Sequence, residues 1–379
     1  MYKILVLGAG LIGGPIATDL SNEKNFEVTA ADINQKLLNK LGTKIHKINI
    51  DLSIQHNVRE IIKDKDIIVN ALPGFIGYAT FQTVIKSKKN VVDLAFYEED
   101  PFTIDELAKQ NNITALVDCG VSPGISNLLI GRAVSKISYI ENIQIFVGGL
   151  PLNPDNRLKY KTVFSVTDLL EEYVRPVRLI ENGKLKIKPP LSDIEQIEFA
   201  GAGLLEAFNS DGLRTLITTT KAKNMKEKTL RYPGHAEKIL LLKDAGFLDK
   251  EEFMIKGVAV SPFEITAKVL SKSLALGKND RDFTILRVIV EGKNNRAKIK
   301  LTYDLLDKFD EQTKTHSMAR TTGFMASMCV RLIASGIFSK KGIFPPEILG
   351  KDEKASEFIL SGLKQKGISI ERNYEEFQI

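Results

Sequence analysis

Residues 3–13 read Lys3-Ile-Leu-Val-Leu-Gly8-Ala-Gly10-Leu11-Ile12-Gly13, a short apolar run followed by the spacing G-x-G-x-x-G. A strand, a glycine turn of this kind and a helix begin a dinucleotide-binding βαβ unit. Gly8 allows the tight turn, Gly10 lets the backbone approach a pyrophosphate, and Gly13 lets the helix pack close to the strand. The phosphates are expected at the positive N-terminus of that helix. We therefore predict that Gly8, Gly10, Leu11, Ile12 and Gly13 bind the cofactor.

The second half of this fingerprint is an acidic residue at the end of the next strand. Residues 27–31 predict that strand, and Asp32 follows it about 20 residues after the last glycine. A carboxylate there can accept both ribose hydroxyls of an adenosine and would repel a 2′-phosphate. No arginine follows in Ile33-Asn-Gln-Lys36. The prediction is NAD rather than NADP, and the alternative is a solvent-facing aspartate in a turn.

Composition limits the function classes. The 379 residues are enough for two domains with their own cores. The net charge of +6 is spread among interspersed acidic residues, which argues against nucleic-acid binding. No apolar run approaches the roughly 20 residues that span a bilayer, and the chain opens on a strand, with no signal peptide recognised. Two cysteines, Cys119 and Cys329, are too few for a disulfide framework, so we expect a cytoplasmic protein.

Strands and helices alternate through residues 1–120. Further strands are predicted at 44–49, 66–70, 90–93 and 113–117, with helical patterns between them. This order predicts an α/β Rossmann domain, a doubly wound parallel sheet covered on both faces. Ligands bind beyond the carboxyl ends of such strands. The predicted cofactor contacts at those ends are Asp51, Ala71, Leu72, Pro73 and Asp93.

The pattern changes in residues 121–317. A strand at 143–147 and a hairpin formed by 283–291 and 297–303 indicate a second α+β domain, for substrate binding and dimerisation. Helical patterns return in residues 318–379 and are expected to pack back on the Rossmann domain. We expect a homodimer or a dimer-based oligomer, because a sheet-rich second domain often supports a symmetric dimer.

Three loops carry residues suited to chemistry. The sixth strand ends in Asp118-Cys119-Gly120-Val-Ser-Pro123-Gly124, which opens a helix containing Asn127. Asp118 is predicted to face the cleft, although a helix entry capped by Ser122 with Pro123 at its first position would also explain the loop. Cys119 is better explained as a small buried thiol than as a nucleophile.

The other two loops lie in the second half, at Phe208-Asn-Ser-Asp-Gly-Leu-Arg214 and Thr229-Leu-Arg231-Tyr232-Pro-Gly-His235. His235 begins a predicted helix at 236–245, where the helix N-terminus lowers its pKa and allows it to accept a proton near neutrality. The alternative is a helix residue without chemistry. No spacing of His, Cys or carboxylates indicates a metal site, so none is expected.

Several segments together resemble the saccharopine dehydrogenase and lysine 6-dehydrogenase family. They occur in order along most of the chain: Gly8 to Gly13, Asp118 to Gly124, Gly148 to Pro151, Ser210 to Arg214, Lys228 to His235 and Ser317 to Gly323. The first is generic, whereas Lys-Thr-Leu-Arg-Tyr-Pro-Gly-His and the Asp-Cys-Gly loop are far more specific. The resemblance implies a Rossmann domain joined to a substrate and dimerisation domain, and oxidation at the amine-bearing carbon of a lysine-type substrate.

The chain is compact, and its loops resemble lysine 6-dehydrogenase more closely than the longer saccharopine enzymes. The implied reaction, part of lysine catabolism, converts L-lysine, NAD and water into 2-aminoadipate 6-semialdehyde, ammonia and NADH. The semialdehyde would then cyclise to piperideine-6-carboxylate.

The reaction implied by the resemblance gives roles to named residues. Hydride leaves only when the amine is neutral, so a base must take a proton from an ammonium with a pKa of about 10.4. His235, or a water it holds, is the first candidate base and Tyr232 the second. Asp118 could orient the amine, and Arg214 or Arg231 could hold the α-carboxylate. The remaining predicted substrate contacts are Cys119, Gly120, Pro123 and Asn127.

Two alternatives remain open from the sequence. A saccharopine or carboxyspermidine-type dehydrogenase would need a second carboxylate clamp, for which Arg157, Arg175 and Arg178 are available. A non-catalytic NAD-sensing protein would keep the fold without the chemistry.

Overall fold

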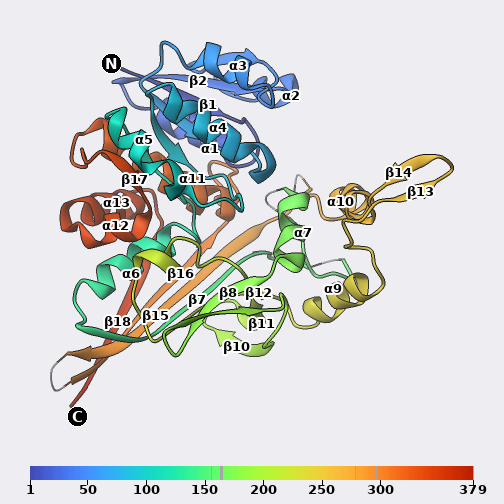
Figure 1. The fold of residues 1–379 in the computed structure, drawn as a ribbon, viewed down its shortest axis with the longest axis vertical. Helices are drawn as coiled ribbons and strands as arrows, with labels where there is room; N and C mark the ends of the chain where they lie inside the picture. The colour runs from blue at the N-terminus through green and yellow to red at the C-terminus, as the bar shows by residue number, and fades with distance from the viewer. Residues whose placement is uncertain (155, 163–164, 278, 295–296, 379) are drawn as a thin grey trace. The chain divides into compact units, whose positions relative to one another are not determined.

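The computed structural model describes every residue except 155, 163–164, 278, 295–296 and 379. The chain forms two compact units (Figure 1). The first contains residues 1–135 and 319–368, and the second contains 136–318 and 369–379. Each unit has its own sheet and core.

The first unit contains a seven-stranded parallel sheet with the order β17-β6-β5-β4-β1-β2-β3. This is the doubly wound Rossmann order 3-2-1-4-5-6 with one further strand, which confirms the predicted α/β class. The interior strand β1 is completely buried over residues 4–7, as expected for a sheet covered on both faces. The strands are β1 Tyr2–Leu7, β2 Phe26–Asp32, β3 His46–Asn49, β4 Ile67–Asn70, β5 Asn90–Asp93, β6 Thr114–Leu116 and β17 Gly342–Phe344.

Helices of the first unit come from both ends of the chain. They are α1 Gly13–Leu20, α2 Gln35–Leu38, α3 Gln55–Ile61, α4 Gly74–Lys86, η1 Pro101–Ile104, α5 Asp105–Gln110, α6 Ile125–Val134, α11 Ser317–Ala334, α12 Pro346–Lys351 and α13 Glu353–Gln365. Arg331 of α11 forms ion pairs with Asp19 of α1 at 2.8 Å and with Glu23 at 2.8 Å. Lys366 also contacts Asp19, at 2.5 Å. The last part of the chain is thereby joined to the first helix.

The observed unit boundaries differ from the predicted ones at two places. Helix α6 was expected in the second domain but belongs to the first unit, because glycines let it pack directly on α12. A Cβ on Gly131 would lie 2.1 Å from the Glu347 carbonyl oxygen, and one on Gly350 would lie 2.1 Å from that of Leu128. Residues 369–379 belong to the second unit, because strand β18 pairs with β16.

A nine-stranded mixed sheet forms the second unit. Its main order is β10-β11-β12-β7-β15-β16-β18, with β8 beside β12 and β9 beside β8. Strands β12 and β7 are parallel, and the other pairs are antiparallel, which agrees with the expected α+β domain. The strands are β7 Tyr139–Pro151, β8 Val177–Glu181, β9 Lys184–Lys188, β10 Glu195–Phe199, β11 Gly203–Asn209, β12 Asn224–Arg231, β15 Asp282–Asn294, β16 Ala297–Lys308 and β18 Ile370–Gln378.

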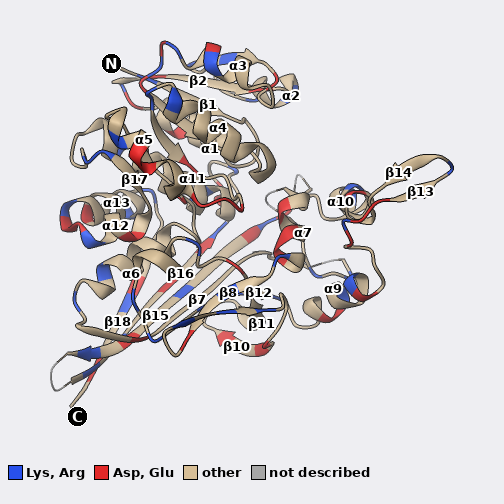
Figure 2. Ribbon diagram, viewed as in Figure 1, with Lys and Arg blue, Asp and Glu red and all other residues tan. Residues whose placement is uncertain are grey.

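Short helices and a small hairpin complete the second unit. They are α7 Val166–Val174, α8 Leu216–Thr219, α9 His235–Asp244, α10 Pro262–Ser273, and the strands β13 Phe253–Ile255 and β14 Val258–Val260. Tyr160, Tyr173, Phe208 and Ile239 lie in a buried cluster with residues of α7, α9 and α10. Basic and acidic residues are interspersed along both units (Figure 2). In the described part of the chain, no helix combines the length and apolar character needed to cross a membrane.

Candidate nucleotide and substrate sites

The glycine turn after β1 has three different local environments. Gly8 has a φ of 96°, and a Cβ there would lie 2.8 Å from the Ala71 carbonyl oxygen. A Cβ on Gly13 would lie 2.0 Å from the Gly8 carbonyl oxygen, whereas a Cβ on Gly10 would meet nothing within 4 Å. Gly8 and Gly13 are therefore required by the turn and by packing. Gly10 leaves the open space that a pyrophosphate needs to approach the backbone.

Asp32 lies at the end of β2 and is tied to this turn. Its Oδ2 accepts a hydrogen bond from Ala9 N at 2.7 Å, and its Oδ1 accepts one from Asn34 N at 2.7 Å. A carboxylate offers about four acceptor positions, so Asp32 keeps capacity for the two ribose hydroxyls. The structure thus places a negative charge beside the glycine turn, as the fingerprint requires.

Two further cofactor candidates lie at neighbouring strand ends. Asp51 Oδ1 accepts hydrogen bonds from Ser53 N at 2.9 Å and Ser53 Oγ at 2.6 Å, and these bonds lower the pKa of the Asp51 carboxyl. Asp51 therefore stabilises its own turn. Ala71 follows β4 with its carbonyl against Gly8, and Leu72 beside it is buried. Pro73 precedes helix α4, so a small residue and a fixed turn adjoin the glycine loop.

Besides Leu11, two exposed apolar side chains at this sheet edge were not predicted as site residues. Ile33 directly follows β2 and is 67% exposed, and Phe75 at the start of α4 is 77% exposed. Leu11 in the glycine turn is also exposed. Apolar groups that remain in water beside a polar turn could cover an adenine or a nicotinamide ring. Ile33 directly follows the carboxyl end of β2, whereas Leu11 and Phe75 lie in the loop after β1 and at the start of the helix after β4.

Asp93 at the end of β5 is a buried carboxyl. Its Oδ1 accepts hydrogen bonds from Ala95 N at 2.8 Å and Asn70 Nδ2 at 3.2 Å, and its Oδ2 accepts one from Tyr97 Oη at 3.3 Å. Burial, with a smaller contribution from the charge of nearby Asp118, raises the pKa of Asp93 to about 8. Asp93 therefore holds the sheet edge together, and it titrates near neutral pH.

Asp118 follows β6 on the adjacent strand and is almost completely buried, with a left-handed φ of 56°. Cys119 N donates to the Asp93 carbonyl at 3.0 Å, which joins the two strand ends. Gly120 N donates to the Pro123 carbonyl at 3.1 Å and closes the loop. A left-handed backbone at a buried non-glycine residue is often found at functional sites.

The prediction that Ser122 caps the following helix is wrong. Helix α6 begins at Ile125 and its N-cap is Gly124, whose φ of 143° suits glycine alone. A Cβ there would lie 1.7 Å from the Gly120 carbonyl oxygen. The helix therefore begins later than Ser122 capping would require, and Pro123 lies outside the helix.

Asn127 and Cys119 point into the protein. Asn127 has no exposed surface, and its Nδ2 donates to Glu347 Oε2 at 3.1 Å. Its Oδ1 accepts from Ser126 Oγ at 2.9 Å, so Asn127 holds the helix entry. Cys119 is fully buried, and burial together with neighbouring Cys329 raises the pKa of its thiol. This agrees with a structural thiol.

His235 is buried in the second unit with both ring nitrogens bonded. Nδ1 donates to the Leu158 carbonyl at 2.7 Å, so Nε2 accepts from Tyr173 Oη at 2.9 Å. Burial, and secondarily the charge of Arg231, lowers the pKa of His235 to about 3. The lowered pKa was predicted, but its extent was not. A histidine of this pKa is a weak base at neutral pH, so the expectation that it accepts a proton there is corrected.

Arg231 and Tyr232 are also engaged within the protein. Arg231 is buried, donates to Glu172 Oε2 at 3.1 Å and to the Leu230 carbonyl at 2.9 Å, and stacks over Tyr160 at 4.3 Å. Tyr232 Oη donates to the Pro151 carbonyl at 2.8 Å, and burial raises its pKa. A tyrosine with a raised pKa stays protonated at neutral pH.

Arg214 occupies a strained position in its loop. Its φ is 45° and it is 8% exposed. Two residues earlier, a Cβ on Gly212 would overlap the Glu227 carboxylate, so the loop packs tightly. The Asp211 carboxylate accepts hydrogen bonds from Arg178 Nε at 3.0 Å and from Arg178 Nη2 at 2.8 Å, which together form a bidentate ion pair. The motif thus combines a strained arginine with an ion pair that fixes the loop.

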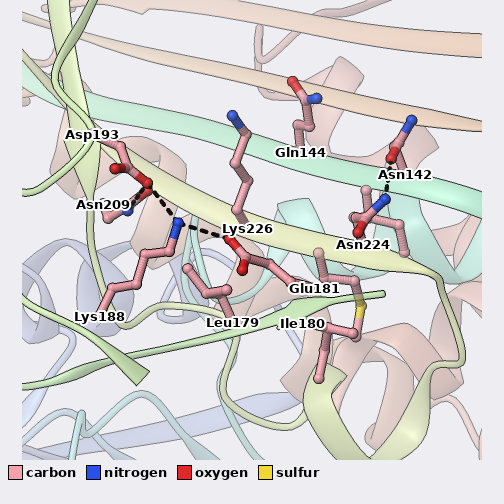
Figure 3. Close-up of a pocket in the computed structure, with 12 residues that line it drawn as sticks. Asn142, Gln144, Leu179, Ile180, Glu181, Lys188, Asp193, Asn209, Asn224 and Lys226 are labelled. Carbon is pink, nitrogen blue, oxygen red and sulfur yellow. Dashed lines mark hydrogen bonds and ion pairs between the residues drawn. The ribbon is translucent and has the colours of Figure 1, made fainter. Parts of the chain in front are cut away.

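A cavity of about 270 Å³ lies elsewhere in the second unit (Figure 3). Lys188 lies between Glu181 at 2.7 Å and Asp193 at 2.9 Å, and Asn224 donates to Asn142 at 2.9 Å. No predicted site residue lines it. Its lining residues are Asn142, Ile143, Gln144, Leu179, Ile180, Glu181, Lys188, Asp193, Asn209, Asn224, Met225 and Lys226.

Comparison with known families covers both parts of the chain. Residues 4–116 match the saccharopine dehydrogenase NADP binding domain, and residues 120–368 match the saccharopine dehydrogenase C-terminal domain. The chain belongs to the saccharopine dehydrogenase family. This confirms the family that the sequence motifs indicated.

Individual relatives are more distant. Mitochondrial alpha-aminoadipic semialdehyde synthase of Rattus norvegicus is 24% identical over 267 residues, which are 66% of this chain and 29% of that protein. Saccharopine dehydrogenase [NADP(+), L-glutamate-forming] of Pyricularia oryzae is 26% identical over 291 residues, 72% of this chain and 64% of that protein. The match therefore spans less than two thirds of either relative.

A solved structure confirms the fold over the whole chain. The apo saccharopine dehydrogenase (L-Glu forming) from Saccharomyces cerevisiae has a TM-score of 0.79 and 17% identity, and the match covers 99% of this chain and 100% of that one. The oxidoreductase prediction is thus supported by family and fold. The nucleotide-binding domain is a NAD(P) domain, and its family name gives NADP.

Proposed function

We propose that this chain is an NAD-dependent dehydrogenase that oxidises the ε-carbon–nitrogen bond of L-lysine. The observation that carries the proposal is the intact nucleotide turn, with open space at Gly10 and the Asp32 carboxylate beside it, in a chain of the saccharopine dehydrogenase family. When bound, the nicotinamide would accept a hydride from the substrate. Residues 8–13, Asp32 and the strand ends beside them would hold the cofactor.

The choice of NAD over NADP rests on charge. Asp32 would lie beside the adenosine ribose, and its carboxylate would repel a 2′-phosphate. Residues 33–36 supply one lysine and no arginine to compensate. The relatives' names that contain NADP favour the other cofactor, so a direct comparison of the two is part of the test.

The choice of lysine rests on the arginines of the second unit. A saccharopine-type substrate carries more carboxylates than lysine and needs more cations. Arg178 is already neutralised by Asp211, and Arg231 by Glu172. Of the arginines suited to a second clamp, Arg178 is therefore engaged and Arg175 lies 4.0 Å from Glu171, which supports a substrate with a single carboxylate. We assign that carboxylate to Arg214 because of its place in the Ser-Asp-Gly-Leu-Arg motif and its left-handed backbone, not because it lacks other contacts.

The proton of the substrate ammonium needs an acceptor other than His235. Asp118 and Asp93 follow adjacent strands at the carboxyl edge of the first sheet, where ligands of such sheets bind. Asp118 would orient the amine. Asp93, with its pKa raised to about 8, would be the proton acceptor at this edge. Water then attacks the iminium, ammonia leaves, and 2-aminoadipate 6-semialdehyde remains.

The direct test supplies purified protein with L-lysine and either NAD or NADP, and follows formation of the reduced nucleotide and of ammonia. The proposal expects both products with lysine and NAD. The relatives' names support a second candidate, a saccharopine dehydrogenase, for which saccharopine would be oxidised and glutamate released. Nucleotide binding without turnover of either substrate would instead indicate an NAD-sensing protein.

A further inference from the structure

The cavity of Figure 3 lies where the sheet of the second unit divides. One edge of β12 pairs with β7, and the other edge pairs with β11 near its end and with β8 at Met225. Strands β8 and β11 therefore share one neighbour and diverge from it. The cavity of about 270 Å³ opens at this divergence, and residues of all four strands and of β9 line it. It is a product of the sheet topology.

One part of the cavity carries surplus positive charge. Lys226 lies directly beside Gln144 in the register of β12 and β7, so both side chains leave the same face of the sheet. Figure 3 shows the two side chains extending in the same direction. Glu195 lies 3.8 Å from Lys226 but 2.7 Å from Lys228, so Lys228 neutralises that carboxylate. The Lys226 ammonium and the Gln144 amide can therefore donate to an anionic group.

Another part of the cavity carries the opposite surplus. The Lys188 ammonium lies 2.7 Å from Glu181 and 2.9 Å from Asp193, so two carboxylates share one cation (Figure 3). Asn209 is 1% exposed, and its Nδ2 donates to Asp193 at 2.9 Å. The buried Asn209 Oδ1 accepts no hydrogen bond from any residue that the structure describes. Surplus carboxylate charge and an unsatisfied acceptor both suit a cationic donor such as an ammonium.

The spacing of the two parts suits a small molecule that carries both charges. Met225 pairs antiparallel with Ile180, and continuing this register makes Glu181 of β8 a diagonal neighbour of Lys226 on the same face. Diagonal neighbours of this kind lie about 7–8 Å apart. A carboxylate and an ammonium on one carbon atom can bridge such a separation with a hydrogen bond at each end. A simple anion or a simple amine would satisfy only one end.

The charge balance and the apolar lining narrow the class of ligand. The two lysines and the two carboxylates that line the cavity cancel, so a ligand of zero net charge keeps the balance. Leu179 and Ile180 also line the cavity and favour an apolar side chain. These requirements describe a free α-amino acid with an apolar side chain.

We propose that this cavity binds such an amino acid, at a site separate from the proposed reaction. Lys226 and Gln144 hold its carboxylate, and Glu181 and Asn209 Oδ1 hold its ammonium. The proposal does not depend on the reaction catalysed, because none of the residues assigned to that reaction lines the cavity.

Isothermal titration calorimetry of the full chain with L-leucine tests the proposal. L-Leucine should bind, whereas 3-methylbutylamine lacks its carboxylate and 4-methylpentanoate lacks its amine. Each of these analogues should bind at least about tenfold more weakly, because one charged end loses its partner. Equal affinity for all three compounds, or no binding of L-leucine at millimolar concentration, would overturn the proposal.

Variants locate the binding. Lys226→Ala and Glu181→Gln should each raise the L-leucine dissociation constant about tenfold or more. Lys186→Ala removes an exposed lysine of β9 that does not line the cavity, and this matched control should leave the affinity unchanged. Asp118→Asn, at the proposed reaction site, should also keep L-leucine binding, so failure of that reaction and failure of this site are distinguishable. Circular dichroism checks that every variant is folded. Binding that survives both cavity variants, or that is lost in Asp118→Asn, would overturn the proposal.

Discussion

Replacing Asp32 with alanine separates its cofactor role from its role in the turn. The carboxylate accepts Ala9 N and Asn34 N, each at 2.7 Å, and would accept the ribose hydroxyls as well. A hydrogen bond to a charged group contributes about 1.5–3 kcal/mol, so the loss predicts an NAD dissociation constant roughly 10- to 150-fold higher. The two backbone amides also lose their acceptor, and the free energy of unfolding should fall by about 1–3 kcal/mol.

The assay is a fluorescence titration of the Asp32→Ala and Asp32→Asn variants with NADH and with NADPH, alongside urea unfolding. Asp32→Asn keeps one acceptor oxygen and removes the charge, so it should lose less NADH affinity than alanine. Both variants should narrow the gap between NADH and NADPH, because the repulsion of the 2′-phosphate is gone. If NADH affinity is unchanged in Asp32→Ala while the protein stays folded, Asp32 lies outside the nucleotide site and the reasoning fails.

Three further perturbations follow from the structure. Gly13→Ala places a Cβ 2.0 Å from the Gly8 carbonyl oxygen and should lower the free energy of unfolding by about 1–3 kcal/mol. Gly10→Ala has open space around the new Cβ, so it should keep the melting temperature and weaken nucleotide binding. Equal melting temperatures for the two variants would contradict this reasoning. The Asp93 carboxyl has a pKa of about 8 when folded, against an ordinary 3.8 when unfolded, so the folded state binds an extra proton between these values. Its contribution to the free energy of unfolding therefore falls as pH rises, by up to about 1.4 kcal/mol per pH unit. Asp93→Asn should remove that slope in urea unfolding at several pH values, and an unaltered slope would refute the buried-carboxyl account. His235 has a pKa of about 3 in the folded state and 6.5 in the unfolded state, so between these values the unfolded state binds the extra proton. The free energy of unfolding of the wild type therefore rises with pH through this range. His235→Gln should lose that rise and leave NAD affinity unchanged, and loss of NAD binding in a folded variant would contradict the placement of His235 outside the nucleotide site.

The nucleotide-binding half was predictable because its signals are local. A parallel strand buried on both faces is a continuous apolar run, and the glycines of residues 8–13 answer steric demands within a few residues of each other. Strand β17 was not predicted. Gly342–Phe344 is only three residues long, and its place beside β6 depends on chain segments more than two hundred residues apart.

The environments of the predicted chemical residues could not be obtained from the sequence. The Tyr-Pro-Gly-His motif correctly placed His235 at a helix start, but its burial depends on Leu158 and Tyr173, which come from other segments. Arg231 was likewise recognised as a cation without its acidic partner, Glu172. Long-range pairing of this kind leaves no local pattern, which is why motif and position were more predictable than charge state and accessibility.

The cap of helix α6 shows the same limit on a smaller scale. Ser122 followed by Pro123 is a common helix start, and the sequence offered it as an alternative explanation of the loop. The structure instead begins the helix at Ile125, because the Gly120 and Gly124 backbones come into close contact. Because this contact involves two glycines four residues apart, the start of the helix could not be predicted from Ser122 and Pro123 alone.

The most direct test of the central claim is a competition between two substrates. Purified protein and NAD are mixed with equal concentrations of L-lysine and saccharopine, and ammonia, glutamate and NADH are quantified over the initial rate period. The account predicts NADH and ammonia in equal amounts, with no glutamate. Glutamate equal to NADH, without ammonia, would contradict it and assign the chain to saccharopine oxidation.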